Sequence, residues 1–312
     1  MAPLIWLVTG STSGIGGALV QHIVARGDKV IASGRQVRSR LGDLQSDSFA
    51  LLELDITASS EVITQKIKQA WEIYGHIDVL VNNAGMSAMS AAEEASDAFT
   101  SNMFAVNLFG PMAITKAILP YMRTKGRGTI CFTSSSTSWT SLPFMSHYAA
   151  SKAALSQYVE CIRKELAPLG IRAVAFESGG MPTHLGQPRE TTDGAASFGN
   201  EGAEIKAYQA GLAGLGGMFM SDPLAFMPGD LDKVAGVIVD VVKGEGLAEG
   251  KKLPVRVLFG SDAYESVMQK LDECARLFGD WKDLTYSTDR DGYGHVTKGE
   301  YMRAVSILDG DE

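Results

Sequence analysis

The chain has 312 residues, of which 45% are hydrophobic and 21% charged, and its formal net charge at pH 7 is −8. No charged or proline-rich linker, low-complexity segment or internal repeat divides it, so we expect one domain over residues 1–312. The acidic balance leaves no basic surface for nucleic acid. The N-terminal apolar stretch has no basic leader and is too short for a signal peptide or a membrane span. We therefore expect a cytoplasmic protein without a membrane span.

The first predicted unit is a strand, a glycine-rich turn and a helix. An apolar run at residues 4–8 reads as a buried strand, and apolar side chains recur at helical spacing over residues 15–25. A dinucleotide pyrophosphate needs this order. Gly10 permits the tight turn, and Gly14 and Gly16 let the backbone approach the phosphates at the helix N-terminus. Ordinary turn chemistry is the alternative.

The second and third predicted strands carry the next candidate residues. The run at residues 29–33 is followed by Arg35, at the position where an acidic residue would bind a ribose 2′-hydroxyl. An arginine suits a 2′-phosphate, so the sequence favours NADP (NADPH) over NAD, with a solvated loop cation as the alternative. The third strand, residues 49–56, carries Asp55, which could meet the adenine or cap the helix that starts near Ser59.

Tyr148 and Lys152 lie four residues apart in a segment that we predict to be helical. Side chains at this spacing share a helix face. A free tyrosine has a pKa near about 10, but a neighbouring ammonium favours the phenolate and lowers that pKa toward the working range of an acid–base catalyst. The pair is a candidate proton donor, although alone it is common in ordinary amphipathic helices.

These motifs occur in the order typical of one family. The chain resembles the single-domain branch of the short-chain dehydrogenase/reductase family over about residues 4–183, and more loosely to about residue 290. Residues 82–85 read Asn-Asn-Ala-Gly, as at the end of a central strand in that family. Asn107 falls where the family has a catalytic asparagine. Ser135 lies thirteen residues before Tyr148, which is the family's spacing and selects it over the neighbouring serines.

The resemblance implies an α/β fold, namely a Rossmann-like doubly wound parallel sheet with helices on both faces. It also implies a substrate lid at about residues 184–228 and a helical C-terminal extension at about residues 265–312. Because the family commonly assembles, a homo-oligomer is possible. The cofactor contacts that it implies, position by position, are Gly10, Ser11, Ser13, Gly14, Ile15, Gly16, Arg35, Asp55, Ile56, Asn83, Ala84, Gly85, Tyr148, Lys152 and Thr183.

The implied reaction is hydride transfer between a nicotinamide and a carbonyl or secondary alcohol. Tyr148 would exchange the proton and Ser135 would orient the oxygen. Lys152 would contact the nicotinamide ribose and lower the tyrosine pKa, and Asn107 would hold a water that links the lysine to solvent. Each residue has a structural alternative: Ser135 as a turn hydroxyl, Asn107 as a buried amide bonded to backbone, and Lys152 as a surface lysine.

The chain departs from the family pattern after the predicted sixth strand, residues 171–176. The family usually has Pro-Gly there, whereas this chain has Ser178 before a glycine. Loss of the proline is expected to loosen the turn beside the nicotinamide. Thr183 matches a threonine with which the family contacts the cofactor, and a helix N-cap is its alternative role.

The segment at residues 184–228 is rich in glycine and contains methionine, leucine and phenylalanine. We expect a mobile lid without regular structure whose apolar side chains face a hydrophobic small-molecule substrate. A bulky ketone therefore suits the sequence better than a sugar or an amino acid. Ordinary core packing or an interface would show the same composition.

Two other functions compete with a ketoreductase. A non-redox dinucleotide-binding scaffold or regulator has no need of a proton donor, so the complete set of catalytic residues argues against it. A nucleotide-sugar epimerase or dehydratase favours Gly-x-x-Gly-x-x-Gly, whereas this chain has Gly-x-x-x-Gly-x-Gly.

Neither the cysteines nor the tail predicts a metal site. Cys131, Cys161 and Cys274 are scattered, which suits buried thiols in a reducing compartment. Residues 289–300 resemble a calcium-binding EF-hand loop at several positions. Tyr293 stands where a ligand is needed, and no second loop is present, so a solvated turn before a short helix is the favoured interpretation.

Overall fold

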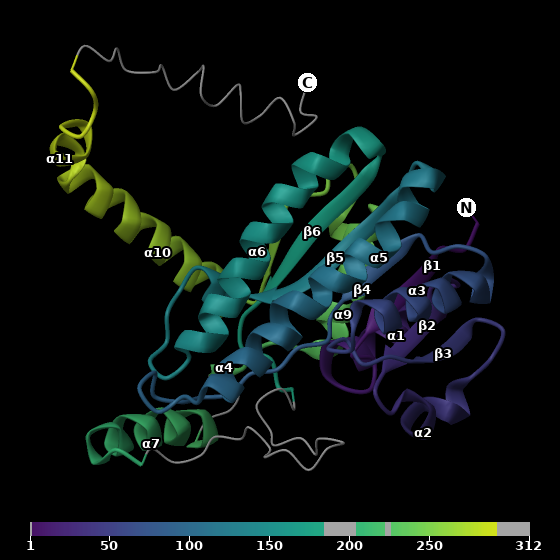
Figure 1. The fold of residues 1–312 in the computed structure, drawn as a ribbon, viewed down its shortest axis with the longest axis horizontal. Coiled ribbons are helices and arrows are strands. Elements are labelled where there is room, and N and C mark those ends of the chain that lie inside the picture. The colour runs from purple at the N-terminus through teal and green to yellow at the C-terminus, as the bar shows by residue number, and fades with distance from the viewer. Residues whose placement is uncertain (1, 184–203, 222–225, 292–312) are drawn as a thin grey trace.

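The computed structural model describes residues 2–183, 204–221 and 226–291. In this part of the chain, seven parallel strands form one sheet in the order β3-β2-β1-β4-β5-β6-β7 (Figure 1). The predicted doubly wound parallel sheet is therefore confirmed. The strands are β1 (Ile5–Thr9), β2 (Lys29–Gly34), β3 (Phe49–Glu53), β4 (Val79–Asn82), β5 (Gly128–Ser135), β6 (Ile171–Ser178) and β7 (Arg256–Phe259).

Helices cover both faces of the sheet (Figure 1). On one face, Ile67, Ile118 and Val159 pack from three helices; on the other, Leu19 and Ile238 pack from two. Since both faces are buried, the strands read as continuous apolar runs. The helices are α1 (Gly14–Ala25), α2 (Val37–Leu41), α3 (Ser60–Tyr74), α4 (Asp97–Phe104), α5 (Gly110–Lys125), α6 (Ser146–Leu166), α7 (Lys206–Ser221), α9 (Leu231–Lys243), α10 (Ser261–Asp280) and α11 (Lys282–Tyr286).

Two predicted strand ends differ from the structure. β3 stops at Glu53, and the next residues form a turn in which Asp55 accepts hydrogen bonds from the Thr57 amide at 2.9 Å and hydroxyl at 2.7 Å. Ser59 caps α3 instead, because its hydroxyl accepts the Val62 amide at 3.4 Å. The alternative role of Asp55 as a helix cap is therefore wrong. β6 is longer than predicted, since it pairs with β5 along eight residues as far as Ser178.

The segment expected to lack regular structure contains a helix. Residues 206–221 form α7, so the expectation of an irregular segment is wrong there. Alanine, leucine and methionine favour a helix, and Gly214, Gly216 and Gly217 have open space around them, so they lower its stability without preventing it. Residues 184–203 and 222–225 of the proposed lid lie outside the described residues.

One described stretch, Asp97–Lys125, is long and apolar enough to cross a membrane by length and composition alone. It comprises α4, a π-helical turn at Ala105–Phe109, and α5. Within its most apolar part 44% is buried in the protein, and Ile114 and Ile118 belong to the main core. Core helices pass the same test, so the stretch is weak evidence of a membrane span.

The cysteines differ in exposure. Cys131 is buried, as predicted, but Cys161 is exposed and Cys274 is half-exposed. The prediction of buried thiols is therefore right only for Cys131. Among the described residues, no group of three or more His, Cys, Asp or Glu side chains could hold a metal ion. Most of the EF-hand-like segment, from residue 292 onward, lies outside the described residues.

Candidate active site

A cavity of about 720 Å³ opens at the carboxyl edge of the sheet. It lies where the strand order reverses between β1 and β4, which is where doubly wound sheets bind ligands. Its volume falls within the range of small-molecule sites. Most of the predicted site residues line it: Gly10, Ser13, Gly14, Ile15, Arg35, Asp55, Ile56, Asn83, Ala84, Gly85, Ser135, Tyr148, Lys152 and Thr183.

The glycine turn after β1 is shaped by close packing of the backbone. Gly10 has a φ of 66°, and a Cβ there would stand 2.8 Å from the Cα atom of Ala84. A Cβ on Gly16 would overlap the Gly10 carbonyl and the Asn83 amide. Gly14 has a φ of 55°, and a Cβ there would stand 3.3 Å from the Thr183 side chain. Gly10 and Gly14 border the cavity, whereas Gly16 acts behind it by letting α1 approach the turn.

Two hydrogen-bonding side chains brace this turn. The Ser11 hydroxyl donates to the Val8 carbonyl at 2.7 Å and accepts the Ser33 amide at 3.0 Å. Ser11 is fully buried and does not line the cavity, so the structure gives it a bracing position behind the turn. Asn83 donates to the carbonyl of Thr9 at 3.1 Å, which ties β4 to the same turn.

The end of β2 presents two arginines to the cavity. Arg35 was predicted from the sequence, but Arg40, one turn along α2, was not. The cluster of arginines in residues 35–40 could have indicated it. Arg38 differs, since its guanidinium donates to the Leu51 carbonyl at 3.5 Å and it is not part of the lining.

Tyr148 and Ser135 meet at the opposite end of the cavity. Tyr148 is buried in the first turn of α6, and burial raises the pKa of its hydroxyl to about 12, while a hydrogen bond with Ser135 acts in the lowering direction. The predicted lowering of the tyrosine pKa by Lys152 is therefore wrong for the protein alone. The loss of water around the buried phenol raises its pKa more than the hydrogen bond with Ser135 lowers it.

Lys152 lies one turn further along α6, also buried. Its ammonium donates to the Thr133 carbonyl at 2.8 Å and stands 5.8 Å from the centre of the Tyr148 ring. Burial lowers the pKa of this ammonium to about 8, because the charged form has lost its water. The alternative role as a surface lysine is excluded by this position.

Asn107 lies in the π-helical turn and does not line the cavity. Its amide group donates to the Met86 carbonyl at 2.9 Å and to the Ser151 hydroxyl at 3.0 Å, and its oxygen accepts the Met86 amide at 2.9 Å. A Cβ placed on Gly85 would stand 3.4 Å from the Asn107 oxygen and 3.6 Å from the Lys152 nitrogen. Asn107 therefore holds the segment after β4 against α6 and faces the same small space as the lysine.

A buried carboxylate that the sequence analysis missed lies behind Ser135. Glu177 has no exposed surface. Its carboxylate accepts hydrogen bonds from Ser138 at 2.9 Å, Ser156 at 2.7 Å and the Trp139 indole at 2.7 Å, and forms an ion pair with Arg256 at 2.8 Å. The sequence signal is an acid directly after the apolar run at residues 173–176, but its partners come from three distant segments.

The partners of Glu177 surround the catalytic candidates. Ser156, on α6, donates its proton to Glu177 and therefore accepts a hydrogen bond from Ser134 at 2.8 Å. Glu177 thereby joins β6, the turn after Ser135 and the helix of Lys152 into one hydrogen-bonded unit.

The turn after β6 is held by the start of α10. Asp262 accepts the Gly180 amide at 2.7 Å, and the Gly179 amide donates to the Phe259 carbonyl at 2.8 Å. The turn that was expected to be loosened by Ser178 is thus fixed by another element. The fold and this cavity define a doubly wound α/β protein with a serine, a tyrosine and a lysine together at its ligand site.

Comparison with known proteins identifies the family. The short chain dehydrogenase family model matches residues 5–194. A solved short-chain dehydrogenase from Streptomyces avermitilis is 32% identical, with a TM-score of 0.79 over 93% of this chain and 100% of that one. Oxidoreductase BOA17 of Botryotinia fuckeliana (strain B05.10) is 28% identical over 91% of this chain and 98% of its own. The 3-ketodihydrosphingosine reductase of Bacteroides thetaiotaomicron is 33% identical over 62% of this chain and 70% of its own. The chain belongs to the short-chain dehydrogenase family of oxidoreductases.

Proposed function

We propose that this protein is an NADP(H)-dependent oxidoreductase that interconverts a carbonyl and a secondary alcohol, acting as a ketoreductase on a hydrophobic small molecule. The observation that carries the proposal is that Ser135, Tyr148 and Lys152 line the same cavity as the glycine turn after β1. A dinucleotide-binding scaffold without redox chemistry would need no such cluster.

The residues at the glycine turn fit a dinucleotide. Gly10 and Gly14 place no side chain between the cavity and the start of α1. Ser13 makes no capping hydrogen bond with its side chain, so the first amides of α1 are available to a phosphate. Arg35 and Arg40 together suit the 2′-phosphate of NADP, because guanidinium groups pair with phosphate oxygens.

The catalytic end fits proton transfer to a carbonyl oxygen. The bound cofactor would supply the hydride. Tyr148, with its pKa raised to about 12, holds its proton at neutral pH and would donate it to the substrate oxygen, which the Ser135 hydroxyl would orient. The Lys152 ammonium, with a pKa of about 8, is charged at neutral pH and would stabilise the phenolate left behind.

The surroundings favour an apolar substrate. Met86, Val106 and Met181 line the cavity near the catalytic residues, and methionine adapts to varied hydrophobic ligands. α7 is attached nearby, since Tyr208 donates to Glu93 at 2.8 Å and its ring stands 6.4 Å from that of Phe144. We propose α7 as the described part of the lid. The 3-ketodihydrosphingosine reductase among the relatives has a keto compound in its name, which agrees with this substrate class.

The test is a screen of ketones and secondary alcohols with NADPH, NADH and their oxidised forms, followed at the nicotinamide absorbance band. We expect turnover of apolar ketones with NADPH. The variant Tyr148→Phe should lose this turnover, and its matched control is Tyr158→Phe, which removes another tyrosine hydroxyl from α6 outside the cavity lining. No turnover of any substrate by a folded protein that binds NADPH would contradict an oxidoreductase and favour the scaffold.

A further inference from the structure

The turn after β6 borders the cavity but has little rigidity of its own. Ser178, Gly179, Met181 and Thr183 all line the cavity. Ser178 stands where the family pattern has a proline, so the backbone lacks the restriction that a proline ring imposes, and two glycines follow it. The conformation of this turn therefore depends on contacts from other elements.

Gly180, in the middle of the turn, is bound by two segments that are distant in the sequence. Its amide donates to the Asp262 carboxylate at 2.7 Å, and its carbonyl accepts the amide of Gly229 at 3.0 Å. A Cβ on Gly180 would overlap the Phe226 carbonyl, so the backbone of residues 226–229 crosses the turn in direct contact. The turn is thus fixed between this segment and the start of α10.

The Asp262 carboxylate occupies a space that two glycines leave open. A Cβ on Gly179 or on Gly260 would overlap this carboxylate, and Gly260 has a φ of 103°. Oδ2 accepts the Gly180 amide, whereas Oδ1 is buried and has no hydrogen-bond partner among the described residues. A buried oxygen without a partner costs free energy, which an acid that only stabilised the helix N-terminus would avoid by remaining in water. The position of Asp262 therefore serves the turn.

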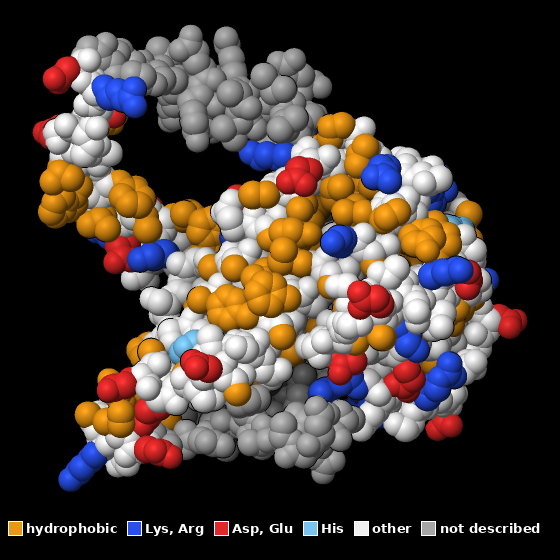
Figure 2. Space-filling model, viewed as in Figure 1, with side chains coloured by type: hydrophobic (Ala, Val, Ile, Leu, Met, Phe, Trp, Pro, Cys, Tyr) orange, Lys and Arg blue, Asp and Glu red, His pale blue; other side chains and the backbone are white. Residues whose placement is uncertain are grey.

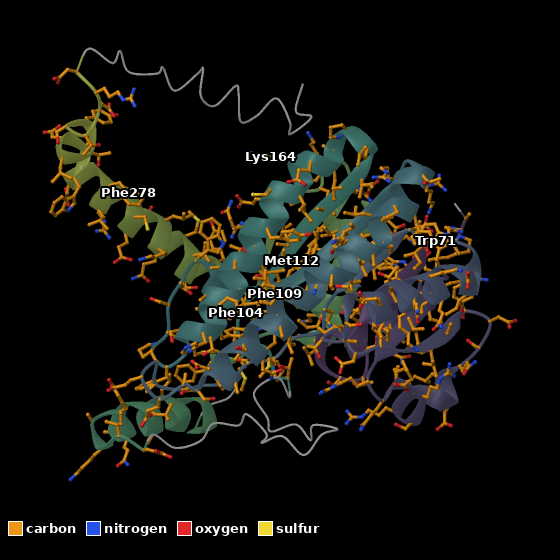
Figure 3. The ribbon with its side chains drawn as sticks, in the orientation of Figure 1. Trp71, Phe104, Phe109, Met112, Lys164 and Phe278 are labelled. Carbon is orange, nitrogen blue, oxygen red and sulfur yellow. The ribbon has the colours of Figure 1, made fainter. Side chains whose placement is uncertain are left out.

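Asp262 lies in the part of α10 that packs against the body. Ala263 and Val267, in the first two turns of the helix, are buried. The rest of α10 extends away from the other helices (Figure 1), and hydrophobic side chains lie exposed along it (Figure 2). Phe278, labelled in Figure 3, lies on this projecting part and is 69% exposed. The attachment of α10 to the body is therefore concentrated around Asp262.

The start of the turn adjoins the proposed proton-transfer group. Ser135 donates to the Ser178 carbonyl at 3.4 Å, and both residues line the cavity with Tyr148. A hydride passes only over a short distance, so the nicotinamide would have to lie beside the substrate carbonyl that Ser135 and Tyr148 bind. The turn after β6 is therefore next to the place that the proposed function requires for the nicotinamide. The adenosine half has its own proposed contacts, at Arg35 and Arg40.

We propose that Asp262 is a positioning residue for the nicotinamide half of the cofactor. By binding the Gly180 amide it would fix the cavity-lining residues on either side, Gly179 and Met181, before the cofactor arrives. Less backbone freedom is then lost on binding, which raises affinity for the part of the ligand that this turn contacts. The inference rests on the proposed function, because it names a contact of the same nicotinamide cofactor.

Calorimetric titration with NADPH and with adenosine 2′,5′-bisphosphate, which lacks the nicotinamide half, tests the proposal. Asp262→Ala should raise the Kd of NADPH about 10-fold, the effect of one lost hydrogen bond, and change that of the bisphosphate less than about 2-fold. Asp262→Asn keeps an oxygen for the Gly180 amide and places its nitrogen at the unpartnered Oδ1 position, so it should bind NADPH nearly as the wild type does. Glu265→Ala is the matched control, because Glu265 is exposed three residues further along the same helix, and it should change neither Kd.

Hydrogen exchange followed by mass spectrometry adds a measurement without cofactor. Asp262→Ala should speed exchange in the peptide that covers residues 177–183 at least about 10-fold, whereas Glu265→Ala should not. Circular dichroism checks that the variants are folded. Asp262→Ser, whose shorter side chain cannot reach as far, replaces Asp262→Ala if that variant is not.

Three results would overturn the inference and leave the proposed function in place. They are equal losses of affinity for NADPH and the bisphosphate, exchange of residues 177–183 that Asp262→Ala does not change, and an Asp262→Asn variant that binds NADPH as weakly as Asp262→Ala. A wild type that binds neither NADPH nor NADH would overturn both, so the two failures give different results.

Discussion

Two turns border the same cavity, one after β1 and one after β6, and different interactions hold them. The first turn is fixed by close backbone contacts at Gly10 and Gly16. The second region depends on two carboxylates, the buried Glu177 behind Ser135 and the half-buried Asp262 against the Gly180 amide. The glycine turn thus depends mainly on steric fit, and the region around Ser135 and Gly180 depends on charged side chains. Substitutions that keep the shape of a side chain but remove its charge should therefore affect the second region and not the first.

The largest expected effect lies at the catalytic end. Tyr148→Phe keeps the ring and removes the proton donor, so kcat should fall about 10²–10⁴-fold while the Kd of NADPH stays nearly unchanged. Steady-state kinetics and fluorescence titration measure the two quantities. If the variant keeps the kcat of the wild type, the catalytic assignment is wrong.

Removing the charge of Glu177 tests the electrostatic half of the comparison. Glu177→Gln keeps the shape but leaves Arg256 with a weaker partner and places an amide where two oxygens accept hydrogen bonds. The free energy of unfolding should fall by about 3 kcal/mol in urea titrations. Glu160→Gln is the matched control, because Glu160 pairs with the same arginine at 2.6 Å from a partly exposed position, and it should cost less than about 1 kcal/mol. Equal losses of unfolding free energy in the two variants would contradict the larger contribution expected of the buried Glu177.

The buried charge of Lys152 should lower the stability of the fold, although the proposed proton transfer needs it. Lys152→Met removes a buried charge and should stabilise the fold by about 2 kcal/mol at pH 7 while reducing kcat. The folded-state pKa of about 8 lies below the ordinary value of 10.5, so between these pH values the folded wild type binds fewer protons than the unfolded chain. The free energy of unfolding of the wild type therefore rises with pH in this range. The amount by which Lys152→Met exceeds it should shrink from pH 8 to pH 10. A difference that is constant over this range would contradict a buried ammonium.

A substitution at Arg35 tests whether charge also contributes to the proposed binding of the cofactor. Arg35→Asp should weaken NADPH binding by about 1–3 kcal/mol and spare or improve NADH binding. Fluorescence titration with both cofactors gives the comparison. Arg38→Asp is the control, since Arg38 does not line the cavity. Equal losses for the two cofactors in Arg35→Asp would refute recognition of the 2′-phosphate.

The smallest effect is expected from steric crowding at the first turn. Gly16→Ala should destabilise the fold by about 1–2 kcal/mol, because its Cβ overlaps the Gly10 carbonyl and the Asn83 side chain. Gly214→Ala in α7 has open space and should be neutral or stabilising by up to about 1 kcal/mol. Thermal unfolding distinguishes them. A reversed order would show that packing does not fix the first turn.

The sequence predicted the parts of the site that are contiguous or periodic. The glycine turn and the Tyr148–Lys152 pair each occupy one short segment, so their spacing alone places them on a turn or a helix face. Glu177 could not be predicted in this way, because its partners come together only when the sheet forms. The tyrosine pKa was predicted in the wrong direction for a related reason: burial is a property of the whole fold. α7 was missed because its glycines mask a helical composition.

Residues 128–178 form one uninterrupted unit, β5–α6–β6, which contains Ser135, Tyr148 and Lys152. Arg35 and Arg40 lie far outside this unit, at the end of β2 and in α2. Recombination between homologous genes with crossovers outside residues 128–178 would therefore keep Ser135, Tyr148 and Lys152 together while exchanging Arg35 and Arg40, and with these two the cofactor preference proposed above. Under the proposed function, cofactor choice and proton transfer would then be inherited independently.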